Sequence, residues 1–164
     1  MNPYMTDLTF DKNFGKFNVR VAVLVEHNDK LLTQNRGDRY WLIGGRIHFG
    51  EDSKQAILRE ISEELCYIPS EKDKLSLNFI CENFFMWDEI PCHEILFIYR
   101  LILSNDSELI KKDNFQCADN KDFNEQWVDF DALANTSLVP RFILDYIRHR
   151  EFKYCTIRND KLTN

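Results

Sequence analysis

The sequence predicts an α+β protein in which a mixed β-sheet is sandwiched between helices. Three observations support this fold class: several short stretches of β-branched and aromatic residues, one amphipathic helix in the middle of the chain, and an apolar helical stripe near its end. This order of elements is typical of a mixed sheet with helices packed on it. The length of 164 residues fits one domain, so residues 1–164 are expected to form a single unit.

The predicted strands are runs of β-branched and aromatic residues bounded by turn residues. In chain order, they are residues 6–10, 18–25, 30–34, 40–43, 75–87, 92–103 and 125–128. Asn28 and Asp29 separate the second run from the third, which predicts a hairpin. The polar and acidic residues between the last two runs are expected to form a long loop.

The central helix has clear start and stop signals. Asp52 or Ser53 can cap its first turn, and Gln55 lies three residues after Asp52, as a capping box requires. Pro69 is expected to end this helix, because proline cannot continue it.

Two further helices are predicted near the end of the chain. Residues 129–133 begin a short helix or turn, and Pro140 suits the first turn of a final helix that reaches about Arg150. The final helix carries an apolar stripe that is expected to pack on the core: Phe142, Ile143, Tyr146 and Ile147.

Composition excludes several classes of protein. The net charge of −6 argues against binding to a nucleic-acid backbone, although a bound metal ion can still attract a phosphate substrate. No apolar stretch is long enough to cross a membrane, and the first residues lack the features of a signal peptide. The five cysteines are widely spaced and form no CxxC pair, which indicates reduced thiols in a cytoplasmic protein.

The central helix presents an electrostatic problem. Glu60, Glu63 and Glu64 fall within roughly 100° of arc on a helical wheel, where like charges repel. A divalent cation with oxygen ligands would explain this arrangement, and a solvated acidic face is the alternative. The opposite side of the same helix is apolar and is expected to pack against the sheet.

The spacing around these glutamates is more specific than the glutamates themselves. Gly45 is followed at fixed intervals by Glu51, by Arg59-Glu60 and by Glu63-Glu64. By average residue usage, the six positions would match by chance in on the order of one window in ten million. Residues 45–67 therefore resemble the Nudix box, the signature of the MutT-like Nudix hydrolases.

This resemblance implies a Nudix α/β/α sandwich and a Mg²⁺-dependent enzyme, with Mn²⁺ as a substitute. Such an enzyme cleaves a pyrophosphate bond in a nucleoside diphosphate linked to another moiety, by attack of water on phosphorus. The substrate class then includes nucleoside triphosphates, nucleotide sugars and dinucleotides, and the resemblance does not choose between them. It implies a small-molecule partner and leaves a homodimer open.

The resemblance also implies roles for individual residues. Glu60, Glu63 and Glu64 would bind the metal, with Glu64 as the principal ligand and the carbonyl of Gly44 completing the coordination. Glu60 is a candidate for the base that activates water. Arg59 would orient a glutamate, whereas Gly45 and Glu51 would support the loop and helix.

Three positions depart from the usual pattern of the family. Cys66 replaces the glycine that suits a left-handed helix end, a conformation that costs a cysteine about 1 kcal/mol or more. Tyr67 replaces an aliphatic residue, and Ile43 stands where many members have proline. Because cysteine rather than glycine occupies position 66, we expect the helix to end differently, with Pro69 as the residue that stops it.

Other candidate site residues lie outside the motif. Arg20, Arg46 and Phe84 are candidates for substrate binding. Many relatives take an extra carboxylate from a loop before the last strand, and the candidates here are Asp119, Asp122 and Glu125. A buried strand carboxylate needs a partner, so Glu82 or Glu94 is expected to face the site if either is buried.

The same fold is also compatible with a protein that binds a nucleotide but does not hydrolyse it. A non-catalytic nucleotide-binding or regulatory module is the competing hypothesis. A module that only binds nucleotides has no need of all three helix glutamates, which favours the enzyme.

Overall fold

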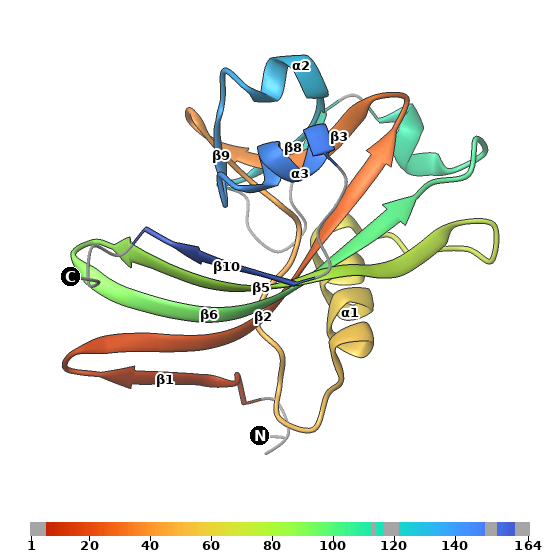
Figure 1. The fold of residues 1–164 in the computed structure, drawn as a ribbon. Coiled ribbons are helices and arrows are strands. Elements are labelled where there is room, and N and C mark those ends of the chain that lie inside the picture. The colour runs from red at the N-terminus through yellow and green to blue at the C-terminus, as the bar shows by residue number, and fades with distance from the viewer. Residues whose placement is uncertain (1–5, 113, 117–121, 150–153, 160–164) are drawn as a thin grey trace.

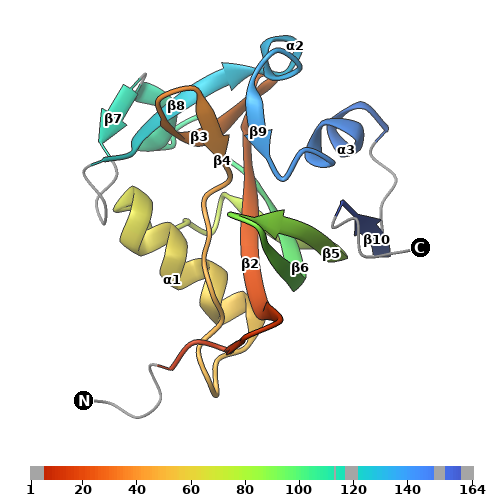
Figure 2. The same ribbon diagram turned by 90° about the vertical axis from the view of Figure 1, so that its left-hand side faces the viewer.

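The fold was determined as a computed structural model, which describes residues 6–112, 114–116, 122–149 and 154–159. One ten-stranded sheet runs through the molecule and lies between helices on its two faces (Figures 1 and 2). The path through the sheet is β10-β5-β6-β2-β3-β4-β9, with β1 beside β2 and β8 beside β3 and β7. The predicted α+β class and the sandwich of sheet and helices are therefore confirmed.

The strands agree with most of the predicted runs. Their bounds are β1 Thr9–Lys12, β2 Gly15–His27, β3 Lys30–Arg36, β4 Arg39–Trp41, β5 Lys74–Trp87, β6 Ile90–Ile102, β7 Asn114–Gln116, β8 Asn124–Asp129, β9 Ser137–Val139 and β10 Tyr154–Arg158. The helices are α1 Ser53–Leu65, α2 Phe130–Leu133 and α3 Ile143–His149, with a 3₁₀ turn η1 at Glu108–Lys111. No helix in this part of the chain is long and apolar enough to cross a membrane.

Two hairpins close with two residues each. Asn28 and Asp29 join β2 to β3, while Asp88 and Glu89 join β5 to β6. All four residues have positive φ values, which match the right-handed twist of the flanking strands. Both hairpins therefore hold long strands in a fixed register, and this register places the cavity residues described below.

The two faces of the sheet carry separate apolar cores. Isoleucines and Leu65 of α1 pack with alternate residues of β2 and β6 on one face. The final helix and Phe142 pack on the other face, around Phe79 and Leu96. Figure 2 shows α1 and α3 on opposite sides of β2. Each helix therefore covers one face, as its apolar stripe predicts.

The capping box at the start of α1 is confirmed. Asp52 accepts hydrogen bonds from the backbone N–H groups of Lys54 and Gln55, both at 2.8 Å. The Gln55 side chain in turn accepts from the backbone N–H of Asp52 at 2.9 Å. This reciprocal pair fixes where the helix begins and therefore where its glutamates point.

The prediction for the end of α1 is wrong. The helix ends at Leu65, and Cys66 has φ and ψ of 48° and 43°, the left-handed conformation that glycine favours. Pro69 lies beyond the helix and does not stop it. The chain is held past the helix end by the fully buried Leu65 and by a hydrogen bond of 2.6 Å from the Tyr67 hydroxyl to Asp73. These contacts offset the free-energy cost of placing a cysteine in the left-handed conformation.

The end of the chain differs from the prediction in two ways. Pro140 lies before α3 rather than in its first turn, and its carbonyl accepts from the N–H of Ile143 at the helix start. The strand β10 has no counterpart among the predicted elements. It pairs in parallel with β5, so its position depends on a partner about 70 residues earlier in the chain.

Asp73 ties three segments together at one carboxylate. It accepts from Tyr67, from the backbone N–H of Ser70 at 2.7 Å and from the backbone N–H of Ser104 at 2.8 Å. Burial raises the pKa of this carboxyl, but the hydrogen bonds outweigh burial and lower the pKa to about 2. Its charged form therefore stabilises the fold.

Replacing Asp73 with asparagine should lower the free energy of unfolding at pH 7 by about 1 to 2 kcal/mol, because a neutral amide accepts these bonds more weakly. The folded pKa lies below the unfolded value of about 3.9, so the wild-type advantage is complete above that value and disappears as the pH falls toward 2. Urea unfolding at pH 7, 4.5 and 2.5 measures this. The exposed Asp131, changed in the same way, is the control. An equal loss at all three pH values would contradict the assignment.

Candidate active site

One guanidinium group organises the carboxylates of α1. Arg59 donates through Nε to Glu51 at 2.9 Å and through Nη1 to Glu60 at 2.8 Å and to Glu63 at 2.9 Å. Its Nη2 donates to the carbonyl oxygen of Arg46 at 2.9 Å and again to Glu51 at 3.1 Å. These contacts offset the repulsion between Glu60 and Glu63 on the helix and join both to Glu51.

Glu51 joins the loop before α1 to the helix. Both of its carboxylate oxygens accept from Arg59, and one also accepts from the backbone N–H of His48 at 2.9 Å. Burial raises the pKa of Glu51, but the hydrogen bonds from Arg59 and His48 outweigh it, and the net pKa lies below the ordinary value. Glu51 is therefore charged at neutral pH and fixes the loop relative to Arg59.

The two glycines allow the carboxylates of α1 to reach the loop. A Cβ atom at Gly45 would lie only 2.2 Å from an oxygen of Glu60, so a larger residue here would displace the Glu60 carboxylate. The backbone N–H of Gly44 donates to Glu64 at 2.9 Å. Gly44 has a φ of 146° and passes so close to β2 that a Cβ atom would lie 2.3 Å from the carbonyl oxygen of Val21. Glu60 and Glu64 thus meet the same glycine turn.

Glu60 is the most buried of the three helix glutamates, with 8% of its surface exposed. Burial raises the pKa of Glu60, the hydrogen bond from Arg59 partly offsets this, and the nearby charge of Glu63 raises it further. The net pKa lies above the ordinary value. A carboxylate with a raised pKa is a better proton acceptor than an exposed one, which suits a general base.

The donor set suits a hard divalent cation, because all of its side-chain donors are carboxylate oxygens. In the conformation observed, however, Glu60 and Glu63 are bonded to Arg59 and Glu64 is bonded to Gly44. Accordingly, no group of three or more His, Cys, Asp or Glu residues within the described ranges is already arranged around one metal position. The residues fit a cation by type and location, and their side chains would turn from these partners to hold it.

A cavity of about 930 Å³ opens beside these carboxylates. Glu60, Glu63 and Gly45 form part of its wall. Among the residues predicted to bind substrate, Arg20 and Arg46 line it. A second cavity, of about 600 Å³, is lined by Gly44 and Glu64, and Arg20 borders both. The described cations around the two cavities could neutralise a phosphate group.

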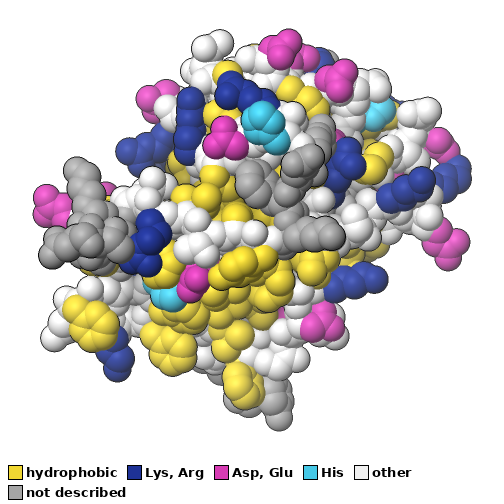
Figure 3. All heavy atoms as spheres, viewed as in Figure 1, with side chains coloured by type: hydrophobic (Ala, Val, Ile, Leu, Met, Phe, Trp, Pro, Cys, Tyr) yellow, Lys and Arg dark blue, Asp and Glu magenta, His cyan; other side chains and the backbone are white. Residues whose placement is uncertain are grey.

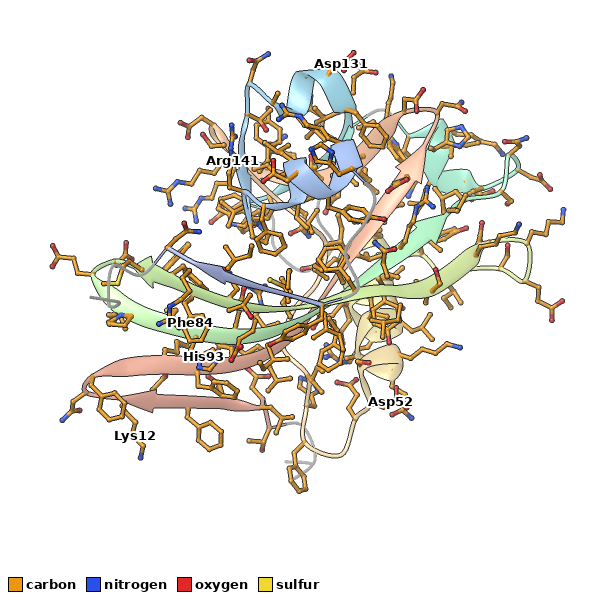
Figure 4. All side chains as sticks on the ribbon, in the orientation of Figure 1. Lys12, Asp52, Phe84, His93, Asp131 and Arg141 are labelled. Carbon is orange, nitrogen blue, oxygen red and sulfur yellow. The ribbon has the colours of Figure 1, made fainter. Side chains whose placement is uncertain are left out.

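The structure corrects the prediction for Phe84. Its ring stacks on His93, with 4.1 Å between the ring centroids, and Arg158 lies over it at 3.9 Å. Figure 4 shows Phe84 and His93 side by side, and Figure 3 shows hydrophobic side chains gathered where β1, β2 and β6 run. This face is opposite the cavity, because successive residues of a strand point to opposite sides. Phe85, the next residue, lines the cavity instead.

The candidates for an extra carboxylate have different positions. Glu125 is fully buried on β8, opposite Gln34 of β3, and Gln34 lines the second cavity. Asp122 is exposed and lies 3.6 Å from Arg36. Asp119 lies outside the described residues. Of the two strand glutamates, Glu94 lines the larger cavity, whereas Glu82 bonds to His93 on the other face at 2.9 Å.

Several cavity residues have no counterpart among the predicted site residues. They include Asn18, Arg39, Asn83 and Arg141. A signal for Asn18 exists in the sequence, because Asn18 and Arg20 alternate with valines in a strand that is otherwise apolar. Arg39 and Arg141 lack such a signal, since they reach the cavity from segments about 100 residues apart.

Comparisons with known proteins concern the sequence and the fold of this chain. The sequence model described as the NUDIX domain matches residues 16–147. No curated protein matches the chain. Among solved structures, the chain is similar in fold to the mutator MutT protein from Bacillus halodurans, with a TM-score of 0.66 and 16% identity over 88% of this chain and 91% of the other.

Two further structures share the fold at similar identity. The MutT protein from Methanosarcina mazei Go1 aligns with a TM-score of 0.55 and 16% identity, over 84% of this chain and 94% of the other. The NUDIX hydrolase from Nitrosomonas europaea aligns with a TM-score of 0.51 and 17% identity, over 87% and 79%. At these identities the likeness concerns the fold alone.

Proposed function

Because this chain belongs to the NUDIX domain family, we propose that it is a metal-dependent hydrolase of a nucleotide pyrophosphate. Its substrate would be a nucleoside diphosphate linked to another moiety, such as a nucleoside triphosphate, a nucleotide sugar or a dinucleotide. The observation that carries the proposal is the convergence of Glu60 and Glu64 on the Gly44-Gly45 turn, with Glu63 beside them on Arg59. A cavity whose lining includes Arg20 and Arg46 adjoins this cluster.

In this proposal, the helix glutamates hold the cation and position the attacking water. Glu60, Glu63 and Glu64 would hold Mg²⁺, or Mn²⁺ in its place, with the Gly44 carbonyl as a further ligand. Bound there, the cation would neutralise the pyrophosphate and lower the pKa of a water molecule. Glu60 would accept the proton of that water, because it is the most buried of the three helix glutamates and lies against the Gly44-Gly45 turn.

Other residues would place the substrate rather than react with it. Arg20 lines the cavity and would contact phosphate oxygens, and Arg46, which bonds to Asp7 at 3.0 Å, would do so through its remaining N–H groups. Arg59 is already engaged by carboxylates, so it would orient Glu60 and Glu63 instead of the substrate. Glu125 is the leading candidate for an extra carboxylate, because its strand runs beside residue Gln34 of the second cavity.

The proposal is tested by a hydrolysis screen of the whole chain. The panel contains nucleoside triphosphates, nucleotide sugars and dinucleotides, with Mg²⁺ or with a chelator, and chromatography separates the products. We expect at least one compound to be cleaved at the pyrophosphate bond only when the cation is present. Binding without cleavage of any compound would refute the enzyme and favour a non-catalytic nucleotide-binding module. The cytoplasmic location and the homodimer stay predictions.

A further inference from the structure

A row of buried polar side chains crosses the floor of the larger cavity. Asn83 of β5, Glu94 of β6 and Asn18 of β2 are register partners on neighbouring strands. All three line the cavity, and each exposes 6% of its surface or less. Polar groups in the centre of a sheet cost free energy unless they are hydrogen-bonded. The row therefore calls for an explanation in terms of its partners.

Most of this row is satisfied by the protein. The amide nitrogen of Asn83 donates to Glu94 Oε1 at 2.9 Å. The amide oxygen of Asn18 accepts from the hydroxyl of Thr9 at 2.8 Å and from Nε of Arg46 at 3.2 Å. These bonds hold the row in place and leave Glu94 at its centre.

The second oxygen of Glu94 is the exception. Glu94 Oε2 is buried and accepts no hydrogen bond from any residue in the described ranges. Nη1 of Arg20 lies 3.8 Å away, which is beyond hydrogen-bond distance. Arg20, Glu60 and Glu94 line the same cavity, so this oxygen belongs to the cavity beside the candidate active site. A ligand group that donates an N–H to Glu94 would remove the cost of this unpaired oxygen.

The surroundings of Glu94 favour an aromatic ring that carries such a donor. A carboxylate accepts hydrogen bonds and repels phosphate, so Glu94 is unsuited to the pyrophosphate itself. Phe85 lies two residues from Asn83 on the same face of β5, and Trp41 and Trp87 also line the cavity. Flat apolar side chains beside a hydrogen-bonding group are the features with which proteins hold a nucleobase by its face and edge.

We propose that Glu94 recognises the exocyclic amino group of an adenine or cytosine base in the substrate. Adenine and cytosine present this amino group, whereas hypoxanthine and uracil present a carbonyl oxygen at the same position, which Glu94 would repel. The inference rests on the proposed function and narrows its substrate class to nucleotides of adenine or cytosine. Asn83 positions Glu94 through its hydrogen bond to Oε1.

The test compares substrates that differ only in this group. The kcat/KM values are measured for paired adenosine and inosine compounds and for paired cytidine and uridine compounds of the class found to be hydrolysed. In at least one pair, the wild type should favour the amino compound by about 100-fold or more, because a buried acceptor discriminates strongly against a group that cannot donate. Equal values in both pairs would overturn the inference and leave the hydrolase proposal intact.

Glu94→Gln replaces a carboxylate that only accepts hydrogen bonds with an amide of almost the same size that can also donate them. The new amide can donate to a carbonyl oxygen, so the preference for the amino compound should fall at least about tenfold. Glu82→Gln is the matched control, because Glu82 lies on the opposite face of the same sheet and bonds to His93 and Tyr154. Its preference should equal that of the wild type. An unchanged preference in Glu94→Gln, with a melting temperature close to that of the wild type, would overturn the inference.

A binding measurement separates this inference from the hydrolase proposal. If the screen finds no cleavage, titration calorimetry of the wild type with AMP, IMP, CMP and UMP still tests the role of Glu94. Tighter binding of AMP than IMP, or of CMP than UMP, would support it, and equal binding within both pairs would overturn it. This measurement also decides the question if Glu94→Gln does not fold.

Discussion

Glu64→Gln should abolish hydrolysis while it leaves the fold intact. The glutamine carbonyl oxygen can still accept from the backbone N–H of Gly44, which donates to Glu64 at 2.9 Å, so the local structure keeps its contact. The substitution removes the negative charge that would hold the cation. A catalytic metal contributes several kcal/mol, so kcat should fall about 1000-fold or more.

The measurement compares kcat for the best substrate of the screen at saturating Mg²⁺. Glu71→Gln is the control, because Glu71 is an exposed glutamate just beyond the same helix. Its kcat should stay within about twofold of the wild type, as expected of a surface substitution. A kcat of Glu64→Gln within tenfold of the wild type would show that Glu64 is not the principal metal ligand.

Arg59→Gln should produce the largest loss of stability among single substitutions in the site. It removes the guanidinium that bonds to Glu51, Glu60 and Glu63, and it leaves these carboxylates to repel one another. Because Glu63 is exposed while Arg59, Glu51 and Glu60 are mostly buried, solvent screening reduces the cost of breaking this charge cluster to about 2 kcal/mol. Because a divalent cation can neutralise the same carboxylates, Mg²⁺ should stabilise this variant more than it stabilises the wild type.

Denaturant unfolding with and without Mg²⁺ measures both effects. Arg36→Gln is the matched control, since Arg36 pairs with Asp122 at 3.6 Å and both side chains are exposed. Its free energy of unfolding should change by less than about 1 kcal/mol. If Arg59→Gln behaves like this control, the network around Arg59 contributes little to the fold, and its role in orienting Glu60 loses its main support.

Local signals account for what could be predicted from the sequence. Asp52 and Gln55 fix the start of α1 through atoms three residues apart, and the turn residues Asn28 and Asp29 fix a hairpin in the same way. The spacing from Gly45 to Glu64 likewise describes one loop and one helix. Each of these features is decided within about 20 residues of chain, so the sequence alone specifies it.

Features that depend on distant partners could not be predicted in this way. The strand β10 forms by pairing with β5, a partner distant in the chain. Cys66 adopts the left-handed conformation because Leu65 is buried on one side of it and Tyr67 is hydrogen-bonded to Asp73 on the other. Local propensity is overridden in both cases by tertiary contacts.

The residues that line the cavity also could not be predicted from local sequence signals. Phe84 and Phe85 are chemically identical, and only the strand register decides which of them faces the cavity. The role of Glu94 depends on Asn83 and Arg20, which come from two other strands. A sequence motif can therefore indicate the reacting groups, but the residues that select a substrate appear only when the sheet is assembled.

The closeness of Gly45 to Glu60 has a practical consequence for protein engineering. A β-carbon at position 45 would lie 2.2 Å from the Glu60 oxygen, so any larger residue there would push the Glu60 carboxylate away from the loop. A mutant library meant to broaden substrate choice should therefore keep position 45 constant. Diversity is better placed at Asn83, Phe85 and Glu94, which line the cavity from the strands and lie outside the motif.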